Sequence, residues 1–376
     1  MKKKLSIVAG SVLVSAALVL TGCTTGTDTP SDSTDSALSP EAQAALDTAF
    51  AGIGGDLVLE PAAAPEGINL FVVSCGEQVP GCSFPAATVA EAGEAAGWTA
   101  TIADGKLNPE GFAAAIRQGI AGGADVIIPI GIGCGVAAAA FQEAVDAGII
   151  VIGGGGVDDC DPKLWASERL WLEDYTPVQQ WNSYGKLQAD YAFGSKDGDV
   201  EAVVLNFTGQ VWGQWITDGF TSELDALGSG EILETIDVSD QEVGDGSFVQ
   251  KVTTALLNHP DVNTLVVPID GMLSNGLAQA ILQTGVDLLV IGRGGEAPVV
   301  DMIRQGGSGV TADVGYASEW GSWGSVDTAI RILNGQEPVY IGEPIQVLDA
   351  DNNLPDAGGY AGGTDFKSIF LEAWGR

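Results

Sequence analysis

The sequence predicts an α/β protein built from two similar, doubly wound parallel-sheet lobes. From residue 68 onward, short β-branched runs alternate with alanine-rich amphipathic stretches, which is the pattern of βαβ units in a parallel sheet. The chain also repeats itself: 139 residues separate Pro129 from Pro268, and 139 separate Gly153 from Gly292, in similar strand-turn contexts. Chance convergence of two ordinary βαβ units is the alternative. With 45% hydrophobic residues and 53 glycines, the chain can form large cores joined by tight turns.

The N-terminal residues 1–22 predict a lipoprotein signal peptide. Three lysines precede an apolar run of 16 residues from Leu5 to Leu20, which is shorter than the roughly 20 residues of a membrane span. The segment Leu20-Thr-Gly-Cys23 resembles the lipobox of bacterial lipoproteins, in which the cysteine is lipidated and becomes the mature N-terminus. A permanent N-terminal anchor is the alternative. We therefore expect an exported protein that is attached to the membrane through a lipid, such as palmitate, on Cys23.

Residues 23–66 predict a tether followed by a short helix. The stretch 24–39 consists almost entirely of Thr, Ser, Asp, Gly and Pro, which cannot bury enough apolar surface to fold. Ser39-Pro40-Glu41 is typical of a helix start, with serine as N-cap and proline in the first helical position. The expected helix covers 42–52.

The alternating pattern then predicts the elements of the two lobes in order. Strands are expected at 68–73, 99–103, 125–130 and 149–152, and then at 202–206, 232–238, 264–269, 288–291 and 309–313. Helices are expected at 84–96, 109–122, 136–147, 176–193, 212–227, 248–258, 272–284 and 320–333.

Charge and cysteine content limit the function further. A net charge of −35 argues against nucleic-acid binding, which depends on Lys and Arg neutralising phosphates. Besides Cys23, four cysteines remain, and an even number in an exported chain predicts two disulfides with three possible pairings. We favour Cys75–Cys82 and Cys134–Cys160, because each pair joins neighbouring loops. The cysteine spacings and the single histidine do not fit a zinc site, so no metal is expected.

The chain lacks a convincing catalytic set. His259 is the only histidine, and it precedes a proline at a helix end, where a capping or exposed role is expected. The glycine-rich turns at 131–135 and 153–156 fit neither a dinucleotide-binding fingerprint nor a phosphate-binding loop, so no cofactor is expected. The acidic loop at 349–356 has Leu354 where a calcium loop requires glycine. An enzyme that uses Asp158 or Asp159 for acid–base chemistry is the remaining alternative.

The two-lobed pattern resembles the solute-binding proteins of ABC importers, specifically the ribose-binding-like, sugar-binding group (type 1 periplasmic binding proteins). The segments that carry the resemblance are LFVVSC at 70–75, GADVIIP at 123–129, TLVVPIDGM at 264–272 and DTAIRILNG at 327–335. The resemblance covers about residues 68–347. It implies a three-stranded hinge, with crossovers near 172–175, 315–317 and 345–347.

The resemblance also implies a domain layout and a function. The first lobe is expected to comprise 67–173 and 317–345, and the second 174–316 and 346–376. A monomer of this kind captures a small polar solute, most simply a sugar or sugar derivative, and delivers it to an ABC permease. A ligand sensor for a kinase or chemoreceptor, or a binder of an aromatic or acidic solute, is the alternative. The expected location is extracytoplasmic and membrane-anchored, and the frequent Ala and Gly fit a Gram-positive cell.

The resemblance places ligand contacts in the loops that follow the strands. Several charged groups that hold sugars in the family are replaced here, for example by Gly153–Gly156, while tryptophans are frequent nearby. Arg293 is expected to pair with a ligand anion or with a neighbouring acid, Glu296 or Asp270. Each of the tryptophans could instead belong to a lobe core. The candidate ligand-binding residues are Glu77, Gln78, Phe84, Asp158, Trp212, Gln214, Trp215, Asp270, Arg293, Glu296, Tyr316 and Trp320.

Overall fold

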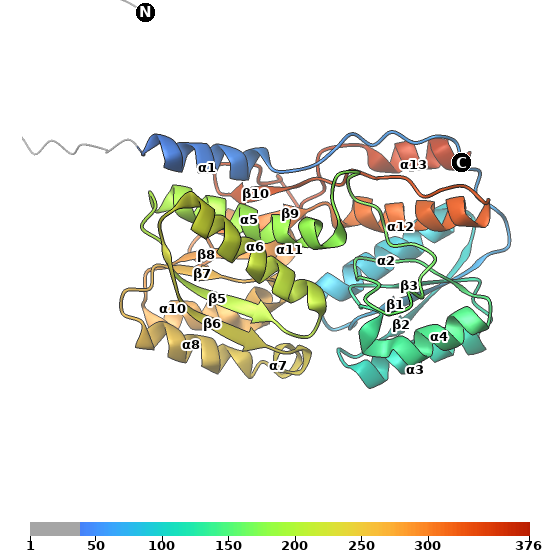
Figure 1. Cartoon of the computed structure of the whole chain (residues 1–376), viewed down its shortest axis with the longest axis horizontal. Helices are drawn as coiled ribbons and strands as arrows, with labels where there is room; N and C mark the ends of the chain where they lie inside the picture. Colours follow the sequence, from blue (N-terminus) through green and yellow to red (C-terminus); the bar gives the residue numbers. More distant parts are fainter. Residues whose placement is uncertain (1–37) are drawn as a thin grey trace, which may run out of the picture. The chain divides into compact units, whose positions relative to one another are not determined.

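The computed structural model describes residues 38–376, whose strands form two separate sheets, as predicted. The predicted signal peptide and Cys23 lie outside the described residues. The first sheet has the order β2-β1-β3-β4, and the second has the order β10-β9-β8-β7-β5-β6 (Figure 1). All neighbouring strands are parallel except β10, which runs antiparallel to β9. The strands are β1 (Asn69–Ser74), β2 (Thr99–Asp104), β3 (Val126–Pro129), β4 (Ile150–Val151), β5 (Glu201–Phe207), β6 (Glu231–Val238), β7 (Thr264–Val266), β8 (Leu289–Gly294), β9 (Ala312–Tyr316) and β10 (Ile345–Asp349).

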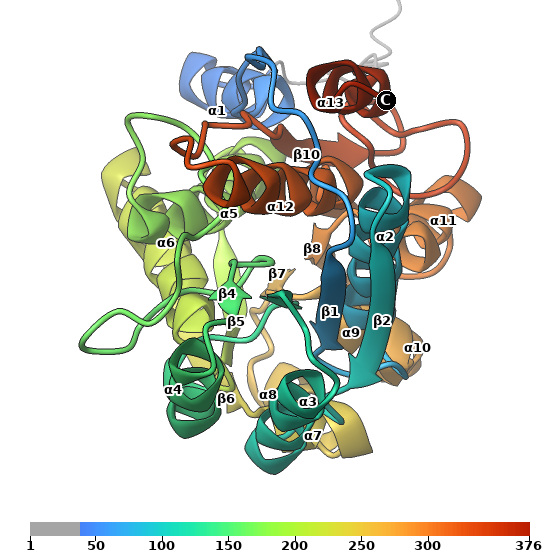
Figure 2. The same ribbon diagram turned by 90° about the vertical axis from the view of Figure 1, so that its right-hand side faces the viewer.

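The first sheet lies between two layers of helices (Figure 2). Its side chains alternate, because successive residues of a strand point to opposite faces. Leu70 and Val72 pack with α2 and α12, whereas Phe71 and Val73 pack with α3 and α4. The helices of this lobe are α2 (Pro80–Ala95), α3 (Pro109–Ala121), the short η1 (Gly135–Ala137) with α4 (Ala138–Asp146), and α12 (Ser318–Leu333).

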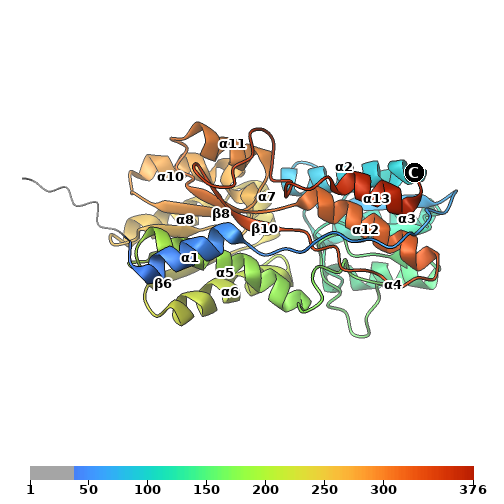
Figure 3. The same cartoon turned by 90° about the horizontal axis from the view of Figure 1, so that it is seen from above.

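The second sheet is also covered on both faces, with α5 and α6 on one side and α10 and α11 on the other (Figure 3). Helices α5 and α6 approach each other closely because Gly185 and Gly219 face the opposing backbone. A Cβ atom at Gly185 would lie 1.9 Å from the Ile216 carbonyl oxygen. The helices of this lobe are α1 (Pro40–Ala51), α5 (Pro177–Ser195), α6 (Val211–Leu227), α7 (Asp240–Asp245), α8 (Phe248–Asn258), α9 (Asp270–Met272), η2 (Leu273–Leu277), α10 (Ala278–Thr284) and α11 (Ala297–Gln305).

The internal repeat forms equivalent strand pairs in the two lobes. In the first lobe β3 lies beside β4, with Val126 opposite Ile150. In the second lobe β7 lies beside β8, with Thr264 opposite Leu289. The glycine-rich segment after β4 and the glycine-rich end of β8 therefore occupy corresponding places, at the carboxyl ends of their sheets.

The chain crosses between the lobes near the three expected places and also crosses twice more. The crossovers are hydrogen-bonded to one another: the Ile341 amide donates to the Leu170 carbonyl (3.1 Å), and the Ala317 amide to the Pro344 carbonyl (3.2 Å). The additional crossovers are 52–68, which leads from α1 to β1, and 350–365, which leads from β10 to α13 (Phe366–Trp374).

The C-terminal helix α13 packs on the first lobe, although the sequence analysis assigned 346–376 to the second. Trp374 stacks on Trp323 of α12 with 5.3 Å between ring centroids, and its indole N–H donates to Asp327 Oδ1 (2.9 Å). Only β10 of this tail joins the second sheet. The aromatic face of α13 explains its position, because it completes the apolar layer around α12. Conversely, α1 packs on α5, with Leu46 against Gly194.

Other elements differ from the predicted ones. Helices α7, α11 and α13 and strand β10 were not predicted, although the Ser239–Glu242 capping box precedes α7. The predicted helix 272–284 is interrupted at Asn275 and Gly276, where Gly276 has a φ of 102°. Within residues 38–376, no helix combines the length and apolar character that a membrane span requires.

Candidate functional site

A cavity of about 130 Å³ lies between the two lobes, at the carboxyl ends of their parallel strands. This is the edge at which open parallel sheets usually bind ligands. One water molecule needs only about 10–15 Å³ of such space, so the cavity can hold a larger solute. The first lobe contributes residues that follow β1, β3 and β4, including Cys75, Gly131 and Gly154–Gly156, together with Glu168 and Arg169. The second lobe contributes Gln180, Trp181, Tyr184, Phe207, Gln210, Trp212, Asp240, Arg293, Glu296 and Tyr316.

Aromatic rings surround the Arg293 guanidinium at one end of the cavity. Its Cζ lies 4.2 Å from the ring centroid of Tyr184, 4.6 Å from Tyr316, 4.8 Å from Trp181 and 5.8 Å from Trp212. Trp181 and Trp212 also stack on each other at 4.6 Å. A cation over an aromatic face is attracted by the ring quadrupole, so these contacts fix the guanidinium in place.

Arg293 reaches the cavity from the end of β8 and is only 6% exposed. Among residues 38–376, its side chain forms no ion pair, and its Nε is buried without a hydrogen-bond partner. Guanidinium has five donors and no acceptor, so unfilled donors require acceptor atoms from outside the protein. The strand end itself is held by Gln188 of α5, whose amide donates to the Val267 and Gly292 carbonyls (3.0 Å each).

Two buried aspartates lie behind Arg293. Asp270 and Asp313 are fully buried, and the Oδ1 atom of each has no hydrogen-bond partner among the described residues. Burial raises the pKa of Asp270 to about 6, although the backbone N–H of Glu296 and the charge of Arg293 oppose the rise. Burial and the nearby Asp270 raise the pKa of Asp313 well above its usual range. Burial therefore opposes ionisation of both carboxyls, while the charge of Arg293 favours ionisation of Asp270.

A second arginine on the cavity wall is already paired. Arg169 Nη2 lies 2.6 Å from Glu343 Oε1, and the glutamate is fully buried. Gly321 makes room for this pair, because a Cβ atom there would lie 2.8 Å from Arg169 Cζ and closer still to Glu343. The pair joins the end of the first lobe to the crossover before β10, close to the hinge.

Three carboxyl groups complete the charged wall. Burial raises the pKa of Glu168, whose Oε1 accepts a hydrogen bond from the Asp158 amide (2.8 Å). Burial also raises the pKa of Asp240 to about 6. Burial and then the Asp270 charge raise the pKa of Glu296 to about 8. Glu296 lies against the first turn of α2 in the other lobe, since a Cβ atom at Gly81 would be 2.3 Å from its Oε1.

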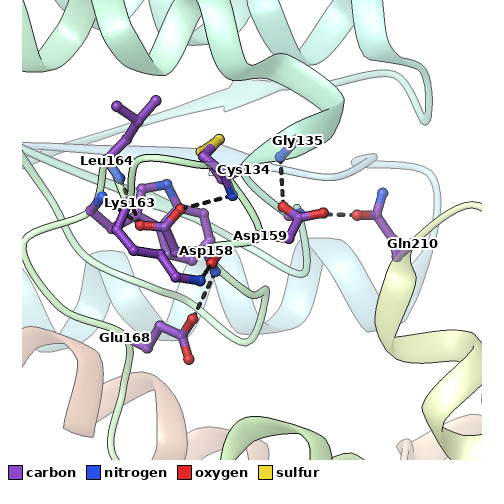
Figure 4. The surroundings of a disulfide bond; sticks show 11 residues. Cys134, Gly135, Asp158, Asp159, Lys163, Leu164, Glu168 and Gln210 are labelled. Atoms are coloured by element: carbon purple, nitrogen blue, oxygen red, sulfur yellow. Dashed lines mark hydrogen bonds between the residues drawn. A yellow bond between two sulfur atoms is a disulfide. The ribbon is translucent and has the colours of Figure 1, made fainter.

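Two hydrogen bonds beside the cavity join the lobes. The buried Gly133 amide donates to Gln210 Oε1 (2.9 Å), and the Trp212 indole N–H donates to the Gly131 carbonyl (3.3 Å). Figure 4 shows Gln210 extending from α6 toward the loop that carries Asp159 and the disulfide. Asp159 holds the same loop by accepting from the Gly135 amide (2.6 Å).

Disulfides fix the first-lobe loops that line the cavity. The structure joins Cys75 to Cys82 and Cys134 to Cys160, the pairing that the sequence analysis favoured. Cys75 and Cys82 themselves lie on the wall. The grouping of Cys134, Asp158 and Cys160 resembles a metal site only in its spacing, because both sulfurs belong to a disulfide and offer no thiolate.

Four of the twelve candidate residues lie on the cavity wall: Trp212, Arg293, Glu296 and Tyr316. Asp270 lies just behind it, where its carboxylate accepts from the Glu296 amide (2.9 Å). Of the two alternatives for Arg293, a direct ion pair with Glu296 or Asp270 is not formed.

The other seven candidates do not line this cavity. Glu77, Gln78 and Gln214 are exposed, and Gln214 bonds instead to Asn206 and Asp218. Phe84 is 50% exposed and borders a separate groove that Glu296 also lines. Asp158 holds its own loop by accepting from the Leu164 and Trp165 amides (2.8 Å each). Trp215 packs on the second-lobe core, and Trp320 stacks on Phe366 in the first-lobe core.

Sequence reasoning missed several residues of the wall. Trp181 and Tyr184 lie three residues apart on α5, so they share a helix face, and that spacing was the available signal. Gln210 and Asp240 each stand at a helix N-terminus after a strand, where a polar residue also fits a capping role. Arg169 lies in an irregular crossover that no periodic pattern marks.

The histidine lies apart from the cavity. His259 Nε2 is 2.9 Å from Glu234 Oε2 on the surface of the second lobe. No nucleophile–base pair is formed around the cavity by the described side chains that line it. The wall offers a solute both polar groups and aromatic faces.

Comparisons with known proteins agree with this architecture. A family model described as periplasmic binding protein domain matches residues 79–337. A galactofuranose-binding protein has a similar structure, with a TM-score of 0.63, 18% identity, and coverage of 82% of this chain and 98% of the other. An ABC sugar transporter subunit from Rhodobacter sphaeroides has a TM-score of 0.63 and 22% identity, and the match covers 76% of this chain and 99% of the other. The 5-methylthioribose transporter solute-binding protein from Thermotoga lettingae has a TM-score of 0.64 and 18% identity, and the match covers 85% of this chain and 96% of the other. No curated protein sequence matched the chain.

Proposed function

Because the chain belongs to the periplasmic binding protein domain family, a group of non-catalytic transport components, we propose that it captures a sugar or sugar derivative between its lobes for an ABC permease. The observation that carries this proposal is the interlobe cavity, whose wall combines aromatic faces with an unpartnered, buried arginine. Ring faces stack on the C–H surfaces of a sugar, while polar groups hold its hydroxyls. Import is supported by the names of two structural relatives, both transporter components.

Closure of the lobes is the step that would retain the solute. The hydrogen bonds from Gly133 to Gln210 and from Trp212 to Gly131 exist only when the lobes are together. The solute adds contacts to both lobes, so it favours the closed arrangement by its differential affinity for that state. The hydrogen-bonded crossovers at the hinge allow such a rotation with little change inside each lobe.

A ligand screen tests the proposal directly. Sugars, polyols, nucleosides and aromatic acids would be compared by thermal shift and then by calorimetry, since a ligand at 100 times its Kd stabilises a protein by about 2.7 kcal/mol. We expect one sugar-like compound to bind the natural protein and Arg293→Met to abolish binding. Arg117→Met is the matched control, because Arg117 pairs with Glu143 on the surface of the first lobe. Binding only of nucleosides or aromatic acids would refute the sugar proposal.

We also propose that Cys23 carries a lipid that keeps the receptor beside the permease at the outer face of the cell membrane. The lipobox-like segment and the polar stretch after it support this proposal. Metabolic labelling with an alkyne fatty acid should mark the natural protein and leave Cys23→Ala unlabelled and released into the medium. A Cys23→Ala protein that stays in the membrane fraction would contradict the anchor.

A further inference from the structure

We propose that the cavity accepts uncharged polyhydroxylated solutes and their amine derivatives, and that it rejects the corresponding acids. The inference rests on the proposed function and adds the sign of the charge that the solute can carry. It depends on which charged groups of the wall have partners within the protein and which do not.

The carboxyl groups on the wall are not neutralised by protein cations. Glu168, Asp240 and Glu296 all line the cavity. In the described part of the chain, none of the three forms an ion pair with a lysine or arginine. Burial raises the pKa of each, and neighbouring carboxyls add to the rise for Glu168 and Glu296, so a further negative charge beside these two groups is disfavoured.

The two arginines do not offset this excess. Arg169 is bound to the buried Glu343, so the pair is neutral as a unit. Arg293 is 6% exposed and has aromatic rings on several sides. Asp270 lies near enough for the guanidinium charge to oppose the rise in its pKa, so an ionised Asp270 offsets part of the Arg293 charge from behind.

Arg293 nevertheless has unfilled hydrogen-bond donors, which are the second indication that a ligand binds here. Hydroxyl oxygens of a neutral polyol can fill them, because a guanidinium donor requires an acceptor atom but not a charged one. A carboxylate on the solute would also reach these donors. It would, however, enter a closed space that already holds the unpaired carboxyls of Glu168 and Asp240, and like charges brought together out of water cost several kcal/mol.

Matched sets of solutes test this charge selection. Galactose, galactosamine and galacturonate form one set, the corresponding glucose compounds a second, and benzyl alcohol, benzylamine and benzoate a third. The Kd of each compound is measured by calorimetry at pH 7.5 and constant ionic strength. Within a set, the acid should bind at least about tenfold more weakly than the neutral compound, and the amine at least as tightly as the neutral compound. An acid within threefold of the neutral compound, or an amine tenfold weaker, would overturn the proposal.

The outcomes also separate this inference from the proposed function. If only the benzyl set binds, sugar binding is refuted, and the order within that set still decides the charge selection. If no set binds, both proposals fail.

The variant Asp240→Asn tests the cause. Asp240 accepts no hydrogen bond from another described residue, so the isosteric amide removes charge without breaking a contact. The ratio of acid to neutral Kd should fall by about three- to tenfold. Asp225→Asn is the control, because Asp225 is exposed on α6. An unchanged ratio in both Asp240→Asn and Glu168→Gln would show that the wall carboxyls do not set the selection.

Discussion

Replacing Gln210 by alanine should weaken solute binding while leaving each lobe folded. Gln210 Oε1 accepts the only hydrogen bond that the Gly133 amide makes among the described residues, across the boundary between the lobes (2.9 Å). In the closed protein this amide is buried, whereas with the lobes apart it can bond to water. The penalty of the substitution therefore applies to the closed, solute-bound state alone.

The magnitude follows from the cost of leaving a buried donor without a partner. That cost is about 1–3 kcal/mol. Since about 1.4 kcal/mol corresponds to a factor of ten in an equilibrium constant, Kd should rise by about 5- to 150-fold. A water molecule that enters the space left by the side chain would place the effect near the lower limit.

Calorimetry with the solute found by the screen provides the assay, and Gln214→Ala provides the control. Gln214 lies one turn further along α6, is exposed, and bonds only within the second lobe, to Asn206 and Asp218. Its replacement should change Kd by less than about twofold. The reasoning is wrong if Gln210→Ala binds within twofold of the natural protein, or if the Gln214 variant loses as much affinity.

Further substitutions probe the interlobe contact and the loops. Gly81→Ala should weaken binding, because its Cβ would lie 2.3 Å from Glu296 Oε1 and the glutamate side chain would have to shift its rotamer, which costs about 0.5–1.5 kcal/mol and is measured as a rise in Kd. Glu296→Gln should raise Tm at pH 8.5 but barely at pH 5. Burial raises the pKa of Glu296 to about 8 in the folded protein, whereas in the unfolded chain Glu296 ionises near pH 4.5. Because the unfolded chain loses this proton first, the natural protein loses stability progressively as the pH rises from about 4.5 to 8. Replacing Cys134 and Cys160 by serine should lower the free energy of unfolding in urea by about 3–4 kcal/mol, given their separation of 26 residues.

A specific result would contradict each of these three predictions. Gly244→Ala, where the new Cβ would meet Leu107 at an ordinary 3.7 Å, should leave Kd unchanged, and an equal loss in both glycine variants would show a general effect on folding. A Tm difference for Glu296→Gln that does not depend on pH would exclude the raised pKa as its cause. An unfolding free energy that is unchanged by the double serine substitution would show that the disulfide does not constrain the unfolded chain.

Most of the fold could be predicted because its signals are local. Strands such as β1 and β5 are continuous apolar runs, which is the pattern of strands buried on both faces. The 139-residue repeat marked the equivalent β3–β4 and β7–β8 pairs. The segment that forms helix α13 was assigned to the wrong lobe, because its position depends on Trp374 meeting Trp323 and Asp327 in another part of the chain.

The site was predicted only where strand ends mark it. Arg293 stands near the end of β8 and Trp212 in the first turn of α6 after β5, and both lie on the cavity wall. Gln214 was chosen because the resemblance places a binding arginine at the start of this helix, but it is exposed, and Gln210 at the N-cap of α6 contacts the other lobe instead. Arg169 comes from a crossover, and its position depends on the buried Glu343, 174 residues away. Such pairings arise from tertiary packing, which no local pattern contains.

The central claim is that a solute is held between the lobes by the wall around Arg293. A crystal structure of the protein with the solute identified by the screen tests this claim most directly. The account predicts density for one solute in the cavity, with its oxygen atoms at the Arg293 guanidinium and contacts to Trp181 and to Glu168 or Gly155 of the other lobe. A solute that is bound to one lobe alone, or outside this cavity, would contradict it.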